Sequence, residues 1–254
     1  MSGVDVRHEV VSKERWTEAR KALLAREKEL TRLRDDLSRQ RRELPWEKVE
    51  KPYVFIGPQG KQTLGELFGK RSQLLVYHFM LGPGWEEGCK SCSFLADQID
   101  GIAVHLAHRD ATLVVASRAP LTEIETFKKR MSWRFPWVSS NGSDFNFDYH
   151  VSFSKEDRVD GKVYYNYGMG GFPQDEGPGL SVFSKNESGE IFHTYSTYGR
   201  GLDILLGAYN YLDMTPKGRD EDGLAFSMAW IRHHDRYEET PVSGGCCHSE
   251  ENRV

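Results

Sequence analysis

The chain has 254 residues, a formal net charge of −4, and 28% charged against 38% hydrophobic residues. This composition is typical of a globular protein, and the slight excess of acidic residues argues against a nucleic-acid or anionic-membrane partner. No apolar run is long enough to span a bilayer, and four cysteines are too few for a disulfide scaffold. The first fifteen residues are polar and lack an apolar signal core, so we expect a cytoplasmic protein.

The N-terminal part, residues 1–45, is predicted to be a helical arm. Ser12 can cap a helix over residues 12–43, and no glycine or proline interrupts this stretch before Pro45. A narrow apolar stripe recurs every seven residues, at Trp16, Leu23, Leu30 and Leu37. We expect the arm to pack across its own domain. The alternative is a coiled coil that joins two copies into a homodimer.

Two buried strands are predicted in the first half of the main domain, residues 46–215. Residues 74–80 and 111–117 are apolar runs of strand length. A helix is expected to follow each of them, the first running to about residue 108 and the second over 121–131. Strand, helix, strand, helix in this order predicts a parallel sheet with right-handed crossovers.

The second half of the domain departs from this pattern. Residues 141–178 are rich in glycine, asparagine, aspartate and aromatic residues and have no helical period, which predicts a large insertion. Residues 180–183 and 190–195 flank a glycine-containing turn and predict an antiparallel hairpin. A helix over 202–212 closes the domain. The rest, 216–254, is predicted to be an extension with a short helix near 224–233 and a disordered tail.

Cys89 and Cys92 stand where a buried strand leads into a helix. Reacting groups in parallel α/β sheets gather at the carboxyl ends of strands. A thiol at the start of a helix meets free backbone N–H groups and the positive end of the helix dipole, which stabilise the nucleophilic thiolate. A second thiol one turn later can resolve the mixed disulfide that the first one forms. The pair is therefore a candidate redox dithiol.

Other interpretations of the cysteines stay open at this point. The pair could supply half of a zinc site with Cys246, Cys247 and His248, although adjacent cysteines are poorly placed for chelation, and we expect no metal. The two thiols could also be inert packing residues. Glu86 and Glu87 lie close by in the chain and would raise the pKa of a neighbouring thiol, against the effect of the helix.

The order of elements resembles the thioredoxin superfamily, and residues 116–140 resemble the peroxiredoxins of the alkyl hydroperoxide reductase type. More closely, the chain is similar to the thioredoxin-like family known as domain of unknown function 899. The motifs that carry this resemblance extend from the N-terminal helix to about Tyr237; they are ELPW (43–46), GCKSC (88–92), WRFPWVSS (133–140), DFNFD (144–148), FHTYSTY (192–198) and LDMTP (212–216). The resemblance implies a thioredoxin-like α/β fold, with a central mixed sheet flanked by helices, and dithiol–disulfide exchange as the activity inferred for the family.

The resemblance also implies site residues beside the cysteines. Pro178, with Pro173 as the fallback, stands where the superfamily places a cis-proline, and His78 stands near the position of a buried proton acceptor. Both also have ordinary structural interpretations, a trans turn proline and a hydrogen-bonded core histidine. Trp85 could form a wall of the site.

Two departures from the better-known relatives limit what the resemblance implies. Thioredoxins carry an aromatic residue directly before the first cysteine, where this chain has Gly88. Peroxiredoxins carry a hydroxyl residue three positions before the peroxidatic cysteine, where this chain has Cys89, and an arginine that holds the thiolate. Arg118 is a conceivable substitute for that arginine.

We therefore predict a thiol–disulfide oxidoreductase without a cofactor. Cys89 would attack, Cys92 would resolve, and an external reductant would restore the dithiol. A peroxiredoxin-type thiol peroxidase that reduces a peroxide substrate and a non-catalytic thioredoxin-like scaffold protein are the alternatives. No nucleic-acid or membrane partner is expected.

Overall fold

The computed structural model describes residues 8–237, which form two units that divide between Trp46 and Glu47. The first unit is built on one continuous helix, α1 (Lys13–Glu43), in agreement with the sequence. Ser12 caps it by accepting a hydrogen bond from the Arg15 amide at 3.4 Å. None of the residues of α1 is buried, its apolar stripe included. The choice between a packed arm and a dimer arm stays a prediction.

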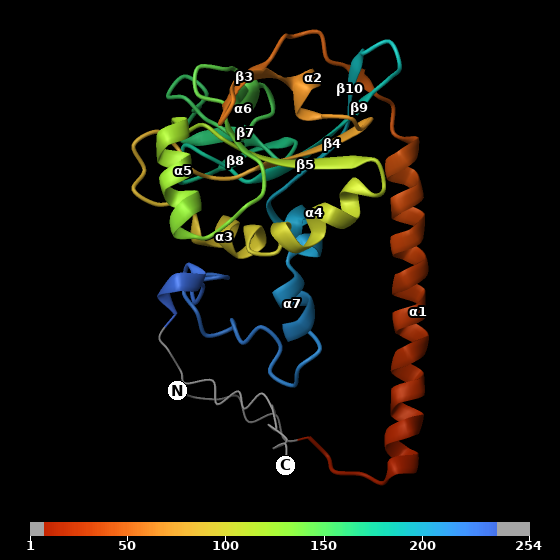
Figure 1. Ribbon diagram of the computed structural model, residues 1–254. Helices are drawn as coiled ribbons and strands as arrows, with labels where there is room; N and C mark the ends of the chain where they lie inside the picture. Colours follow the sequence, from red (N-terminus) through yellow and green to blue (C-terminus); the bar gives the residue numbers. More distant parts are fainter. Residues whose placement is uncertain (1–7, 238–254) are drawn as a thin grey trace, which may run out of the picture. The chain divides into compact units, whose positions relative to one another are not determined.

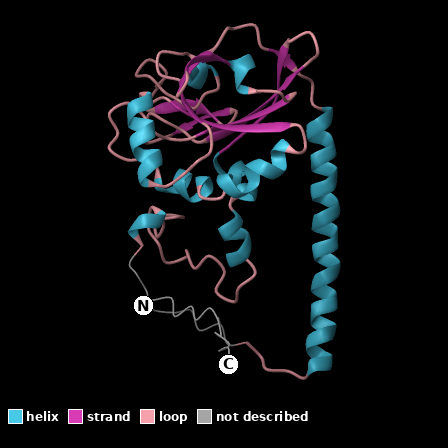
Figure 2. Ribbon diagram, in the orientation of Figure 1, coloured by secondary structure: helices cyan, strands magenta, loops and turns pink. Residues whose placement is uncertain are grey.

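The second unit is a mixed sheet flanked by helices (Figures 1 and 2). The strands of its eight-stranded sheet are β1 (Glu47–Lys48), β2 (Val54–Gly57), β3 (Gly60–Thr63), β4 (Gln73–His78), β5 (Ala111–Ser117), β6 (Trp137–Ser139), β9 (Gly179–Lys185) and β10 (Ile191–Tyr198). The helices are α2 (Leu64–Leu67), α3 (Lys90–Ala96), α4 (Ile99–Ala107), α5 (Leu121–Arg130), α6 (Phe145–Asp148) and α7 (Gly207–Leu212), with 3₁₀ turns at Gly199–Leu205 and His234–Arg236.

The strand order of the sheet is β1-β10-β9-β4-β5-β6-β2-β3. β4, β5 and β6 run parallel, as the alternation of strands and helices predicts, and β9 and β10 form the expected antiparallel hairpin against β4. In chain order, the elements of this arrangement are β4, the helices α3 and α4, β5, α5, the β9–β10 hairpin and α7, with β6, α6, β7 (Lys162–Tyr165) and β8 (Gly168–Gly171) inserted between α5 and β9. This order, with β4 between β5 and β9, is the thioredoxin-like arrangement, and that expectation is confirmed.

Side chains on the two faces of the sheet enter two separate cores. On one face Tyr77 and Phe79 pack with residues of α3, α4 and α5, whereas on the other Leu74 and Val76 pack with residues of α2 and α6. Successive residues of β4 thus point to opposite faces, as in any strand. The face covered by α3 is the one that matters for the cysteines, because Cys92 belongs to its core.

Four segments differ in detail from their predicted form. The helix expected over 202–212 is a 3₁₀ helix over Gly199–Leu205 followed by the short helix α7. The helix expected up to residue 108 is divided into α3 and α4 by a break at Asp97 and Gln98. The stretch 141–178 contains α6 and a small two-stranded sheet of β7 (Lys162–Tyr165) and β8 (Gly168–Gly171). The helix predicted near 224–233 is wrong: this segment is irregular.

The irregular segment is held by side chains in place of a helical ladder. The Glu221 carboxylate accepts hydrogen bonds from the Tyr209 hydroxyl at 2.5 Å, the Trp230 indole N–H at 2.7 Å and the Met228 amide at 2.9 Å.

Among the residues that the structure describes, no helix combines the length and apolarity needed to cross a membrane.

Candidate dithiol site

Cys89 and Cys92 lie at the start of α3, on the loop that follows β4. Cys89 is the N-cap residue and is partly exposed, and Cys92 is buried, with 2% of its surface accessible. Both are free thiols. The Cys89 amide donates to the Met80 carbonyl at 3.0 Å, and the Cys89 carbonyl accepts from the amide and the hydroxyl of Ser93, each at 2.9 Å. The backbone on either side of the first thiol is therefore fixed.

The two thiols have opposite acidities. The Cys92 thiol and the backbone N–H groups of Cys92 and Ser91 favour negative charge on Cys89, and they lower the pKa of Cys89 to about 7 against the opposing effect of burial. Burial, followed by the interaction with Cys89, raises the pKa of Cys92 well above its usual range. Near neutral pH the arrangement therefore favours a thiolate on Cys89 and a protonated thiol on Cys92.

Tyr77 is a site residue that the sequence reasoning missed. It lies in the same buried cluster as Cys92, and its hydroxyl interacts with that thiol in a way that lowers the pKa of Cys92, though less than burial raises it. Burial raises the pKa of Tyr77 itself far above its ordinary value. The alternation of side chains along β4 is visible in the sequence, but the face that α3 covers is not.

Of the two interpretations of His78, the structure supports the hydrogen-bonded core histidine and not the proton acceptor for the cysteines. As the neighbour of Tyr77 in a strand, His78 points to the opposite face of the sheet, where its ring stacks on Phe145 and Tyr149. Its Nε2 is hydrogen-bonded to Ser181 Oγ at 2.9 Å. Burial, and to a smaller degree His193, lowers the pKa of His78 to about 3, so the ring is neutral. It is a core histidine.

Pro178 is near the site but is not a cis-proline. The structure has no cis peptide bond in its described part, so the cis geometry expected at Pro178 or Pro173 is wrong. The trans chain is held by a hydrogen bond from the Tyr165 hydroxyl to the Pro178 carbonyl at 2.7 Å. Because Gly179 pairs with His78 across the sheet, Pro178 still lies at the carboxyl end of β4.

Gly88, in the position that is aromatic in thioredoxins, lies against two core rings. A Cβ atom on this residue would come within 2.5 Å of a Phe79 ring carbon and 2.7 Å of a Phe127 ring carbon. No side chain fits there without displacing the core. The loop has its aromatic residue at Trp85 instead, which is partly buried and packs against the same core as Cys89.

Two arginine side chains pair with Glu87, the carboxylate that is nearest to the thiols along the chain. Glu87 forms ion pairs with Arg130, at 2.7 Å, and with Arg236. A carboxylate whose charge is balanced in this way raises the pKa of a neighbouring thiol less than a free one does. The groups that lower the pKa of Cys89 are first the Cys92 thiol and then the backbone N–H groups of Cys92 and Ser91 at the start of α3.

Arg118 is tied to a partner other than the thiols. It follows β5, and its Nε donates to the Glu176 carboxylate at 2.6 Å. The other oxygen of that buried carboxylate accepts from the Ser152 hydroxyl at 2.6 Å, and burial raises the pKa of Glu176. The Arg118–Glu176 pair thus joins the end of β5 to the stretch 141–178.

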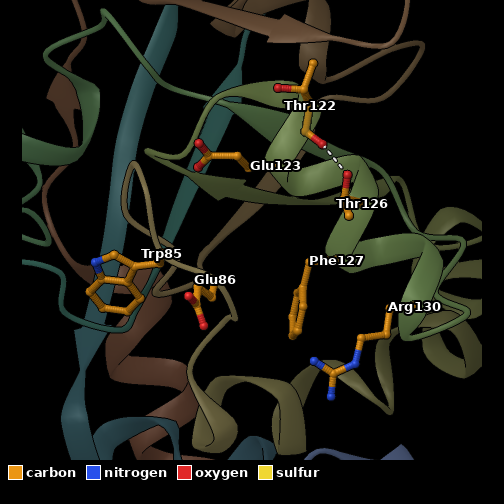
Figure 3. A pocket seen from close by; sticks show the side chains of 7 residues that line it. All are labelled: Trp85, Glu86, Thr122, Glu123, Thr126, Phe127 and Arg130. Carbon is orange, nitrogen blue, oxygen red and sulfur yellow. Dashed lines mark hydrogen bonds between the residues drawn. The ribbon is translucent and has the colours of Figure 1, made fainter.

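A pocket of about 320 Å³ lies beside the loop that leads to the cysteines. In Figure 3, Trp85 and Glu86 of this loop lie on one side of the pocket, and Phe127 and Arg130 of α5 lie on the other. Glu123, Thr122 and Thr126 complete the lining. The pocket offers aromatic side chains and both signs of charge next to the loop that leads to Cys89.

The zinc interpretation depends on Cys246, Cys247 and His248, which lie outside the described residues. Within residues 8–237, no group of three or more His, Cys, Asp or Glu side chains is arranged to hold a metal ion.

Solved structures similar to this chain include peroxiredoxins of low sequence identity. A cysteine-to-serine mutant of peroxiredoxin Q from Xanthomonas campestris is 13% identical, with 66% of this chain and 98% of that chain covered and a TM-score of 0.41. Peroxidoxin BcpB from Mycobacterium tuberculosis is 11% identical (65% and 94% covered, TM-score 0.43), and a cysteine-to-serine mutant of PrxQ from Xylella fastidiosa is 12% identical (62% and 87%, 0.37).

A comparison with curated proteins finds no match. The family model described as "Bacterial protein of unknown function (DUF899)" matches residues 5–237, which is nearly the whole chain, and the protein therefore belongs to this family.

Proposed function

We propose that this protein is a thiol–disulfide oxidoreductase in which Cys89 attacks a substrate disulfide and Cys92 resolves the product. The observation that carries the proposal is the contrast between the two thiols: a partly exposed one whose pKa is lowered to about 7, and beside it a buried one whose pKa is raised. The first cysteine is thus prepared as nucleophile, and the second is protected from premature reaction.

The reaction balances as two exchanges. The Cys89 thiolate bonds to one sulfur of the substrate disulfide, and the other sulfur leaves as a thiolate that takes up a proton. Cys92 then loses its proton and attacks the Cys89 sulfur, which releases the second substrate thiol. The protein is left with a Cys89–Cys92 disulfide and has lost two electrons, which an external dithiol returns.

The proposal explains how a thiol with a raised pKa can act in the second step. Burial is the largest cause of the raised pKa of Cys92, and the neighbouring Cys89 is the second. Once Cys89 is part of a mixed disulfide it no longer carries charge, so this contribution disappears. Tyr77, which interacts with the Cys92 sulfur, then favours the second thiolate. The pocket lined by Trp85 and Arg130 would receive the substrate chain beside the loop that leads to Cys89.

A peroxidase that uses Cys92 as its peroxidatic residue has less support. Such a residue must be an accessible thiolate, whereas Cys92 is buried and protonated. Arg118, which would have to hold that thiolate, donates to Glu176. The peroxidase alternative has a second form, in which Cys89 reacts with the peroxide. The test below therefore includes hydrogen peroxide.

The test is peptide mapping of the four cysteines after separate treatment with oxidised glutathione and with hydrogen peroxide. With oxidised glutathione we expect one intramolecular disulfide between Cys89 and Cys92 that dithiothreitol reverses, formed at concentrations that leave Cys246 and Cys247 largely unmodified. Disulfide formation with peroxide alone would favour the peroxidase. Persistence of both site thiols under both oxidants would contradict the proposal and favour a non-catalytic protein.

A further inference from the structure

The peptide group that leads into Cys89 is held at both edges. Its N–H donates to the Met80 carbonyl at 3.0 Å, and its carbonyl, that of Gly88, is hydrogen-bonded to Nε2 of His233 at 2.9 Å. A peptide group is a rigid plane, so two hydrogen bonds on opposite edges fix its rotation. The first partner belongs to the loop itself, whereas His233 lies 145 residues later in the chain.

His233 is well suited to hold a backbone carbonyl. The side chain is buried, with 1% of its surface accessible, and its ring stands edge-to-face with Phe127 at 5.4 Å. Nδ1 faces the Arg130 guanidinium at 3.3 Å. The Glu87 carboxylate lies 3.6 Å from Nδ1, beyond hydrogen-bond distance. A guanidinium can only donate and a carbonyl can only accept, so the two hydrogen bonds of the ring place its proton on Nε2, toward Gly88.

Arg130 is itself fixed, which orients the histidine. Its guanidinium donates to Glu87 at 2.7 Å and to both carboxylate oxygens of Asp235 at 2.8 and 3.0 Å. Figure 3 shows the side chain reaching from α5 to the rim of the pocket beside the loop. One set of charge-assisted hydrogen bonds thus joins the loop before Cys89, the helix α5 and the C-terminal segment.

We propose that His233 is a positioning residue for Cys89: by holding the Gly88 carbonyl, it sets the direction in which the Cys89 sulfur faces the amide N–H groups at the start of α3. The segment after α7, which the sequence predicts to be an extension of the domain, then completes the dithiol site. The inference rests on the proposed function, because it concerns the reactivity of the same thiol. It adds that the reactivity of Cys89 depends on a residue far along the chain from the Cys-x-x-Cys motif.

The test compares two amides in place of the imidazole. In His233→Gln the amide nitrogen can occupy the position of Nε2 and keep the bond to Gly88, whereas in His233→Asn it can only occupy that of Nδ1. Arg232→Ala is the matched control, since Arg232 is exposed in the same segment and, within residues 8–237, its guanidinium donates only to the carbonyls of Ala229 and Ile231. The readout is the pH profile of iodoacetamide alkylation at Cys89, followed by peptide mapping.

We expect the midpoint for His233→Asn to rise by about one pH unit, which lowers the rate at pH 7 about fivefold. The Gln variant and the Arg232→Ala control should stay near the wild-type profile. If the Asn variant does not fold, His233→Phe, which keeps an aromatic ring against Phe127, takes its place with the same expected shift. A His233→Asn or His233→Phe profile that superimposes on a wild-type midpoint near pH 7 would overturn this inference and leave the proposed function intact. A wild-type midpoint at the value of an ordinary thiol would instead count against the proposed function.

Discussion

Replacing Cys89 with serine is expected to lower disulfide turnover on the order of 1,000-fold or more, because a hydroxyl cannot replace the thiolate that starts the reaction. Cys92→Ser should behave differently. Its Cys89 still attacks, but the mixed disulfide finds no second thiol and accumulates. Cys89→Ser thus loses the attack on the substrate disulfide, whereas Cys92→Ser loses only the resolution of the mixed disulfide.

A chromogenic aromatic disulfide, supplied with an excess of an external reductant, separates these outcomes. Both variants are made on a Cys246→Ser, Cys247→Ser background so that only the site thiols respond. Without reductant, Cys92→Ser should release one equivalent of aryl thiol and carry the other aryl group on Cys89, whereas Cys89→Ser should release almost none at pH 7. Turnover by Cys89→Ser close to that of the background protein would remove Cys89 from the mechanism.

Gly88→Ala is expected to destabilise the protein by about 1–3 kcal/mol, the usual cost of forcing an extra methyl group into a packed core. The added Cβ would lie 2.5 Å from Phe79 and 2.7 Å from Phe127. These rings are buried and held by neighbouring aromatic side chains, so the loop has to move instead. A larger residue here, such as the aromatic one of thioredoxins, should cost more.

Gly101→Ala is the matched control for this substitution. Gly101 is an exposed residue of α4, and a Cβ atom added to it would meet nothing within 4 Å. This change should leave stability equal or raise it by about 0.5–1 kcal/mol, since alanine favours a helix over glycine. Urea denaturation curves of both variants provide the comparison. Equal midpoints would mean that the loop before Cys89 is not packed as described.

The sequence predicts the elements of the fold because the fold rests on local patterns. The buried runs that became β4 and β5 are apolar on both faces, as central parallel strands must be, and the glycine turn after Lys185 specifies the β9–β10 hairpin. The order of these elements leaves few topologies open. Segment 224–233 was predicted as a helix because its residues tolerate one, whereas a hydrogen-bonded Glu221 decides its form.

Only the part of the site formed by residues close together in the sequence could be predicted. Cys89 and Cys92 lie together because they are three residues apart at a helix start, and the motif itself shows this. Which neighbour in β4 approaches them depends on the face that α3 covers, so the sequence does not point to Tyr77, whereas His78 was expected there only through the resemblance to thioredoxins. The contact between His233 and Gly88 joins residues 145 positions apart, and a single sequence carries no signal for it.

The most direct test of the account is the pH dependence of alkylation at Cys89 and Cys92 in the reduced wild-type protein, followed residue by residue with iodoacetamide. We predict a half-maximal rate at Cys89 near pH 7 and no appreciable reaction at Cys92 below about pH 9, because burial and the neighbouring thiolate keep Cys92 protonated. Cys92→Ala should move the Cys89 midpoint upward, since it removes the largest contribution to the lowered pKa. A Cys89 midpoint at about 8.5, the value of a free thiol, or faster reaction at Cys92, would contradict the account.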